Sequence, residues 1–137
     1  MIRKELSVEA RDEQLAEVQD FVQNLLESAG VPLKVQMQIS VAVEEIFVNI
    51  AHYAYVLKNG PATVRVSITE NPAQLALTFI DRGIPYDPTK AQTPDISLPA
   101  AKRRIGGLGI YLTKKLMDEV HYEYRNGQNI LTLLKNL

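Results

Sequence analysis

A long helical segment in the first half of the chain constrains the fold more than any other feature. Between Pro32 and about Leu57, apolar side chains recur at the spacing of one helix face, at Ile39, Val43, Ile46, Phe47, Ile50 and Ala54. Glu45 and Asn49 are four residues apart, so their side chains lie one above the other at the edge of this apolar stripe. The segment therefore predicts a helix that buries one face and carries an acid and an amide along its margin.

The polar edge of this helix has two interpretations. Gln38 and His52 share it with Glu45 and Asn49, whereas Glu44 points nearly the opposite way. An acid and an amide at the margin of a core-facing helix can face a half-buried cavity, and they can equally form a wetted flank. His52 is expected to be a structural or surface histidine rather than a ligand.

Before this helix, residues 2–10 carry a strand pattern, and the apolar spacing over 15–26 predicts an amphipathic helix. Gly30 suits the C-terminal cap of that helix, and Pro32 suits the first turn of the next one.

The second half of the chain is rich in predicted strands. They are expected at 64–68, 75–79, 120–125 and 130–134. Turn residues at 70–73 join the first two, and Asn126-Gly127, a strong hairpin signal, joins the last two. Because the strands arrive mostly in hairpins, we expect an α+β fold: a two-layer α/β sandwich with a mixed, mostly antiparallel sheet and about three helices on one face.

Composition supports one domain over residues 1–137, since a chain of this length suits a single core. The formal net charge is −1, so no strong field attracts nucleic acid or an anionic membrane. There is no cysteine, which excludes disulfides and thiolate metal sites. No apolar run approaches the ~20 residues that cross a bilayer, so a cytoplasmic protein is expected.

A carboxylate stands where the second strand of the first hairpin ends. Asp81 has the same parity as Leu75, Leu77 and Phe79, so its side chain emerges on the core-facing side. It needs a partner there, because an unpaired buried polar group costs about 1–3 kcal/mol. The residues from Asp81 to Pro85 can also be read as no more than a strand-ending turn.

A proline-rich loop and a glycine cluster follow. Residues 82–105 show no period and hold four of the seven prolines, which is typical of lids and binding loops. Gly106-Gly107-Leu108-Gly109 then opens a helix to about Asp118, and the backbone N–H groups at a helix start bind phosphate well. Lys102, Arg103 and Arg104 can meet phosphate charge, or they can form a solvated face; the glycines can also be a flexible hinge.

Several other sites are excluded. The chain has no P-loop motif, no G-x-G-x-x-G and no G-x-S-x-G, and two histidines are too few for a histidine-rich zinc site. The remaining groups suit a nucleotide. The Asn49 amide oxygen is a hard ligand for Mg²⁺, and the Glu45 carboxylate can orient or deprotonate a hydroxyl. Asp81 can accept a hydrogen bond from the amine of adenine, and Gly83 lets the backbone approach a flat ring.

These three features, in this order, resemble the motifs of the GHKL superfamily, whose ATP-binding (Bergerat) fold is shared by gyrase B, histidine kinases and MutL. The segment Glu45-Ile46-Phe47-Val48-Asn49 resembles the N-box. Asp81-Arg82-Gly83-Ile84-Pro85 resembles the G1 box, and Gly106-Gly107-Leu108-Gly109-Ile110 the G2 box. The likeness covers roughly residues 10 to 135. Small size and the segments 49–55 and 116–120 are similar to the anti-sigma factor serine/threonine kinases of bacteria, a branch with a histidine kinase-like ATPase domain.

The resemblance implies cofactors, partners and residue roles. It implies ATP and Mg²⁺ as cofactors, and a sigma factor and a STAS-type anti-sigma antagonist as partners, often with a homodimer. It gives Glu45 as the catalytic carboxylate, Asn49 as the Mg²⁺ ligand, and Asp81 and Gly83 as adenine contacts. The phosphate side is then formed by Arg104, Gly106, Gly107, Leu108 and Gly109.

Three functions stay open at this point. The first is a kinase that phosphorylates a serine on the antagonist, with the loop 82–105 closing over the nucleotide. The second is a nucleotide-gated binding module without phosphoryl transfer. It is motivated by a departure from some members, which carry an arginine beside the G2 glycines where this chain has Ile105 and Leu108. The third is the ATP-binding subunit of a histidine kinase.

Overall fold

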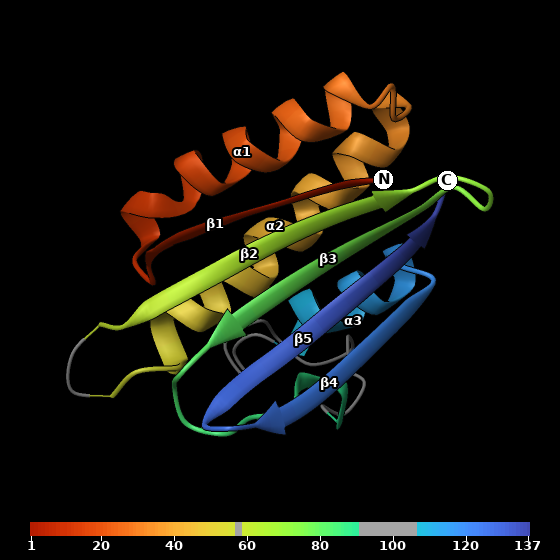
Figure 1. Ribbon diagram of the computed structural model, residues 1–137. Helices are drawn as coiled ribbons and strands as arrows, with labels where there is room; N and C mark the ends of the chain where they lie inside the picture. Colours follow the sequence, from red (N-terminus) through yellow and green to blue (C-terminus); the bar gives the residue numbers. More distant parts are fainter. Residues whose placement is uncertain (57–58, 91–106) are drawn as a thin grey trace.

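The computed structural model describes residues 1–56, 59–90 and 107–137 (Figure 1). Its helices are α1 (Leu15–Ser28), α2 (Leu33–Tyr53) and α3 (Gly107–Leu116), with short 3₁₀ turns η1 (Asp12–Gln14) and η2 (Pro88–Lys90). Its strands are β1 (Ile2–Glu9), β2 (Pro61–Thr69), β3 (Gln74–Asp81), β4 (Glu119–Arg125) and β5 (Gln128–Asn136). The order of elements is the predicted one, and the α+β prediction is confirmed.

The five strands form one sheet in the order β1-β2-β3-β5-β4, and each neighbouring pair runs antiparallel. The predicted sheet, described as mixed and mostly antiparallel, is therefore fully antiparallel over the described strands. Figure 1 shows α1, α2 and α3 side by side on one face of this sheet. No helix in the described ranges is both long and apolar enough to cross a membrane.

The core lies between the sheet and the inner sides of α1 and α2. The alternating residues predicted to face inward are buried, at Val64, Val66, Ile68, Leu75, Leu77 and Phe79. The stripe of α2 is buried at Ile39, Val43, Ile46 and Phe47. Two side chains, Phe47 of α2 and Phe79 of β3, are the largest that the core covers completely. Removing either ring would cost about 3–5 kcal/mol.

The turn between α1 and α2 has the predicted glycine cap. Gly30 adopts φ +73°, the left-handed conformation that costs glycine little. Its N–H donates to Glu27 O at 3.0 Å, and the Val31 N–H donates to Leu26 O at 3.0 Å. These two bonds, with buried Leu26 beside buried Val31, form a Schellman cap. The cap ends α1 and allows α2 to begin directly after Pro32.

Several boundaries differ from the sequence prediction; for example, β2 spans 61–69 rather than 64–68, and α3 ends at Leu116 rather than near Asp118. α2 ends at Tyr53 rather than near Leu57, because the Ala54 carbonyl accepts the Ile84 N–H at 2.9 Å instead of continuing the helix. β5 is longer than predicted at both ends. Its hairpin turn has φ +54° at Asn126 and +76° at Gly127, as a type I′ turn requires.

Candidate functional site

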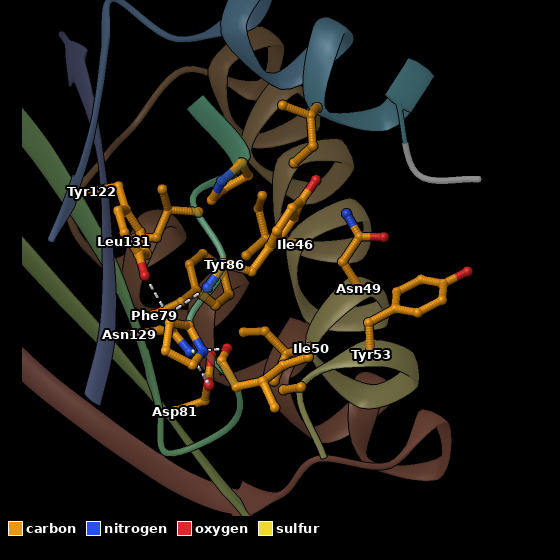
Figure 2. Close-up of a pocket in the computed structure, with 15 residues that line it drawn as sticks. Ile46, Asn49, Ile50, Tyr53, Phe79, Asp81, Tyr86, Tyr122, Asn129 and Leu131 are labelled. Atoms are coloured by element: carbon orange, nitrogen blue, oxygen red, sulfur yellow. Dashed lines mark hydrogen bonds between the residues drawn. The ribbon is translucent and has the colours of Figure 1, made fainter. Parts of the chain in front are cut away.

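A cavity of about 460 Å³ lies between α2 and the ends of the central strands (Figure 2). This volume is in the range of small-ligand sites. Its lining is mostly apolar, with a few polar groups: Ile46, Asn49, Ile50, Tyr53, Ala54, Phe79, Asp81, Ile84, Pro85, Tyr86, Pro88, Ile110, Tyr122, Asn129 and Leu131. Such a combination suits a flat apolar ring that also carries hydrogen-bonding edges.

The cavity has two chemically different ends. At the sheet side lie Asp81, Asn129 and Tyr122, which we call the Asp81 end. On the opposite side, Asn49 and Tyr53 project from α2 (Figure 2). We call the group formed by Asn49, Glu45 and Gly109 the Asn49 end. Sequence reasoning placed Asn49 and Asp81 in one site, and both line this cavity.

Asp81 is the last residue of β3 and is only 6% exposed. It accepts the Gly83 N–H at 2.8 Å and the Asn129 Nδ2–H at 2.9 Å, both on Oδ1. The hydrogen bonds between described residues thus leave Oδ2 for the cavity. The predicted partner of this buried carboxylate exists, and a second acceptor oxygen is available to a ligand.

Sequence reasoning missed Asn129. It lies on β5 directly opposite Asp81 in the strand register and is 7% exposed. A signal was present: Asn129 has the parity of buried Leu131 and Leu133, so a polar side chain was due on the core-facing side. Burial raises the pKa of the Tyr122 hydroxyl, so the group stays protonated. It donates a hydrogen bond to Asn129 Oδ1.

Gly83 serves packing in this structure. A Cβ at Gly83 would lie 2.2 Å from Ala54 O and 2.6 Å from Ala54 Cβ, far inside contact distance. The glycine therefore lets the turn after β3 pass directly over the end of α2. The role predicted for Gly83 from the sequence was a different one, close approach of the backbone to a ligand ring, and that role stays a prediction.

Glu45 lies beside the cavity and is not among its lining residues. A Cβ at Gly109 would be 1.9 Å from Glu45 Oε2, so the carboxylate packs directly on the backbone of α3. Burial, and then the charge of Glu44, raises the pKa of the Glu45 carboxyl. Gly109 thus leaves the space that the Glu45 carboxylate occupies in this structure, and a larger residue there would displace that carboxylate to another rotamer.

The glycine cluster opens α3 as predicted, with Gly107 as its first residue and Leu108 its second. Ile110 of this helix lines the cavity, so the start of α3 adjoins the site. Arg104 and Gly106 lie outside the described residues, as do Lys102 and Arg103. Their predicted phosphate contacts stay predictions.

The loop predicted as a lid is described over its first nine residues, 82–90. This part is tied down: the Tyr86 N–H donates to Asn129 Oδ1 at 3.1 Å, and Lys114 Nζ of α3 donates to Thr89 O at 2.6 Å. Residues 91–105 of the loop lie outside the described ranges. His52 is on the surface, 2.8 Å from Asp12, as expected of a structural or surface histidine.

The donor set fits Mg²⁺ bound mainly by a ligand and water. Among the described residues no group of three or more histidine, cysteine or acidic side chains converges as a metal site. Mg²⁺ commonly needs only one or two protein ligands when phosphate oxygens supply others. Asn49 provides one oxygen donor at the cavity wall, and none of the hydrogen bonds between described residues involves its amide.

Two proteins with similar sequences are named as kinases. BtrW of Bordetella bronchiseptica, named a serine/threonine-protein kinase, is 27% identical over 100 residues, covering 73% of this chain and 70% of the relative. RsbW of Bacillus cereus, named a serine-protein kinase, is 25% identical over 131 residues, covering 93% of this chain and 81% of the relative. The prediction of a kinase agrees with both names.

Two solved structures share the fold. The RsbU and RsbW domains of Rv1364c from Mycobacterium tuberculosis match with a TM-score of 0.72 at 16% identity, covering all of this chain and 33% of that one. The chain thus spans a third of that longer protein. The SiaB-SiaC complex of Pseudomonas aeruginosa matches with a TM-score of 0.56 at 14% identity, covering 96% of this chain and 89% of that one.

A family profile also matches most of the chain. The profile described as "Histidine kinase-like ATPase domain" matches residues 8–135, nearly the range over which the motif resemblance was drawn. That range contains α2, the Asp81 turn and the start of α3, which carry the three motifs found in the sequence. This chain belongs to the histidine kinase-like ATPase domain family.

Proposed function

We propose that this protein is a serine kinase of a partner-switching system, which binds ATP with Mg²⁺ and phosphorylates a serine on a STAS-type anti-sigma antagonist. The observation that carries the proposal is the single cavity lined by both Asn49 and Asp81 in a chain of this family. The sigma factor and the antagonist follow from the resemblance of its motifs to the anti-sigma branch. The proposal includes a cytoplasmic location, a single domain and a homodimer.

The Asp81 end suits the base of the nucleotide. The free Oδ2 of Asp81 is an acceptor, and the exocyclic amine of adenine is a donor. The apolar side chains of Ile50, Phe79 and Leu131 would cover the faces and edges of the ring. ATP is thereby favoured over nucleotides that present a carbonyl at that edge.

The Asn49 end suits the phosphates. The amide oxygen of Asn49 would hold Mg²⁺, and the backbone N–H groups at the start of α3 would face phosphate oxygens. When bound, Mg²⁺·ATP supplies the phosphoryl group and neutralises its developing charge. The chain then has to hold the acceptor hydroxyl in line.

Glu45 is the group proposed to do so. The serine oxygen forms a bond to the γ-phosphorus, the bond from that phosphorus to the β–γ bridging oxygen breaks, and ADP leaves. The hydroxyl proton passes to the Glu45 carboxylate. The raised pKa of Glu45 supports this role, because a more basic carboxylate accepts a proton more readily.

A second candidate is a binding module without phosphoryl transfer. It is favoured by the position of Glu45, whose carboxylate packs on Gly109 and does not line the cavity. In that case the nucleotide would only select the partner-binding conformation. Both candidates require ATP binding and differ in what Glu45 does.

One experiment separates them. The protein is incubated with γ-labelled ATP and candidate STAS-domain partners, and transfer to serine is measured beside ATP binding by calorimetry. Labelled serine that disappears in Glu45→Gln while ATP affinity is retained supports the kinase. If ATP binds but no partner is labelled, the binding module is supported and the kinase is contradicted. If ATP does not bind, both candidate functions are contradicted.

A further inference from the structure

The hydrogen bonds of Asn129 use the full capacity of its side chain. Its Oδ1 accepts hydrogen bonds from the Tyr86 N–H and the Tyr122 hydroxyl. Its Nδ2 donates two hydrogen bonds of 2.9 Å, one to Asp81 Oδ1 and one to Ile84 O. An asparagine amide has two acceptor positions and two donor hydrogens. All four are satisfied, in a side chain that is 7% exposed.

Two of these partners fix which way the amide points. The Tyr86 N–H can only donate, and the Ile84 carbonyl can only accept. A reversed amide would face N–H with N–H and oxygen with oxygen. The backbone of the loop after β3 therefore holds Nδ2 toward Asp81.

The orientation of Asn129 determines what Asp81 offers. Nδ2 and the Gly83 N–H both donate to Oδ1 of Asp81, so that oxygen is engaged by two donors. The carboxylate cannot turn about its axis without losing both bonds. Oδ2, which takes part in none of the hydrogen bonds between described residues, is then the carboxylate oxygen left to accept a hydrogen bond from a ligand.

We propose that Asn129 is a positioning residue for nucleotide recognition, which holds Asp81 so that its free oxygen selects a ligand amine. This inference rests on the nucleotide-binding function proposed above. It assigns the preference for an N–H donor at the base edge to the pair Asp81–Asn129, with β5 contributing as much as β3. Tyr122 supports the pair from β4.

The test compares ATP with purine riboside triphosphate, which has hydrogen in place of the exocyclic amine. Both affinities are measured by calorimetry in the parent protein and in Asn129→Asp, which puts an oxygen against Asp81 and Ile84. In the parent, ATP should bind about tenfold to a hundredfold more tightly than the analogue. In Asn129→Asp this ratio should fall to within about threefold, because two facing carboxyls must share a proton and Asp81 no longer presents a fixed acceptor.

The control is Asn136→Asp, the same chemical change at the exposed end of β5. It should keep the parent ratio. If Asn129→Asp does not fold, Asn129→Ser gives the same readout with the Nδ2 donor removed. The ratio should still fall.

The outcomes are distinguishable. If the folded Asn129 variant loses affinity for both nucleotides by the same factor, or keeps the parent ratio, Asn129 is a structural residue and the inference is wrong. A parent that binds ATP but does not prefer it to the analogue contradicts the assignment of Asp81 as well. A parent that binds neither nucleotide overturns the proposed function, and the inference with it.

Discussion

The two ends of the cavity are built differently. At the Asp81 end, side chains from three strands and the backbone of the following loop are joined by hydrogen bonds. At the Asn49 end, no hydrogen bond between described residues involves the side chain of Asn49 or Glu45, and a glycine gives the acid its space. The first end is held by the protein's own hydrogen bonds, and the second is the end at which we propose that the phosphates and Mg²⁺ bind.

Because of this difference, we expect mutations at the two ends to change different properties of the protein. Changes at the Asp81 end should alter folding and base preference, because the protein's own bonds are broken there. Changes at the Asn49 end should alter the rate of phosphoryl transfer with little loss of stability.

Glu45→Gln is expected to lower the rate of phosphoryl transfer by about 10²- to 10⁴-fold, the usual contribution of a general base. ATP affinity should stay within about threefold of the parent, because the side chain does not line the cavity. Single-turnover transfer to a partner serine measures the first quantity, and calorimetry the second. Glu17→Gln, the same chemical change at an exposed position of α1, is the matched control and should behave as the parent. An active Glu45→Gln enzyme would remove Glu45 from catalysis.

The same residue gives a pH dependence. Because the pKa of Glu45 is raised in the folded protein, the folded state holds this proton more tightly than the unfolded state. The resulting stabilisation is complete below the unfolded pKa and is lost as pH rises through the folded pKa. Glu45→Gln should therefore match or exceed the parent in unfolding midpoint at neutral pH. The parent's transfer rate should fall as pH drops through the folded pKa. A marked loss of stability in Glu45→Gln at neutral pH would contradict the division between the two ends.

Gly83→Ala should destabilise the fold by about 3 kcal/mol, since the new methyl group would meet the backbone of Ala54 at 2.2 Å. Urea denaturation measures the free energy of unfolding. Gly30→Ala is the comparison: its φ of +73° is strained for alanine but its surroundings are open, so about 1 kcal/mol is expected. Equal losses at both positions would show that packing at Gly83 does not organise the Asp81 end.

Asp81→Asn should weaken ATP binding by about 1.5–3 kcal/mol, the value of a hydrogen bond to a charged group. Calorimetry measures the affinity, and Asp20→Asn on the exposed surface of α1 serves as control. Equal affinity for variant and parent would take Asp81 out of the site and break the comparison between the two ends.

Tyr122→Phe should have the smallest effect, about 1 kcal/mol of stability, because it removes one hydrogen bond to Asn129 and keeps the ring. Tyr124→Phe, on the same strand and 47% exposed, should be neutral. Thermal unfolding of the two variants and the parent makes the measurement. A neutral Tyr122→Phe would show that the Asp81–Asn129 pair holds without β4.

Much of the fold could be predicted because its signals are local. The alternation of Val64, Val66 and Ile68, the cap at Gly30 and the Asn126-Gly127 turn each depend on neighbouring residues and on backbone conformations that few side chains tolerate. The α+β class, the order of elements and the antiparallel hairpins follow from them. The motifs at Glu45–Asn49, Asp81–Pro85 and Gly106–Ile110 were likewise visible, since each is a short contiguous run.

Local sequence patterns are enough to predict which segments become helices and strands, which faces they bury, and that an acid, an amide and a second acid accompany them. Which of these groups meet depends on how the elements pack. Asp81 and Asn129 are opposite each other through the pairing of β3 with β5, Gly83 passes over Ala54, and Glu45 packs on Gly109. Such contacts join residues far apart in the chain, and they depend on strand register and helix packing. A local pattern does not encode either, because burying the same apolar faces is compatible with more than one alignment of the elements.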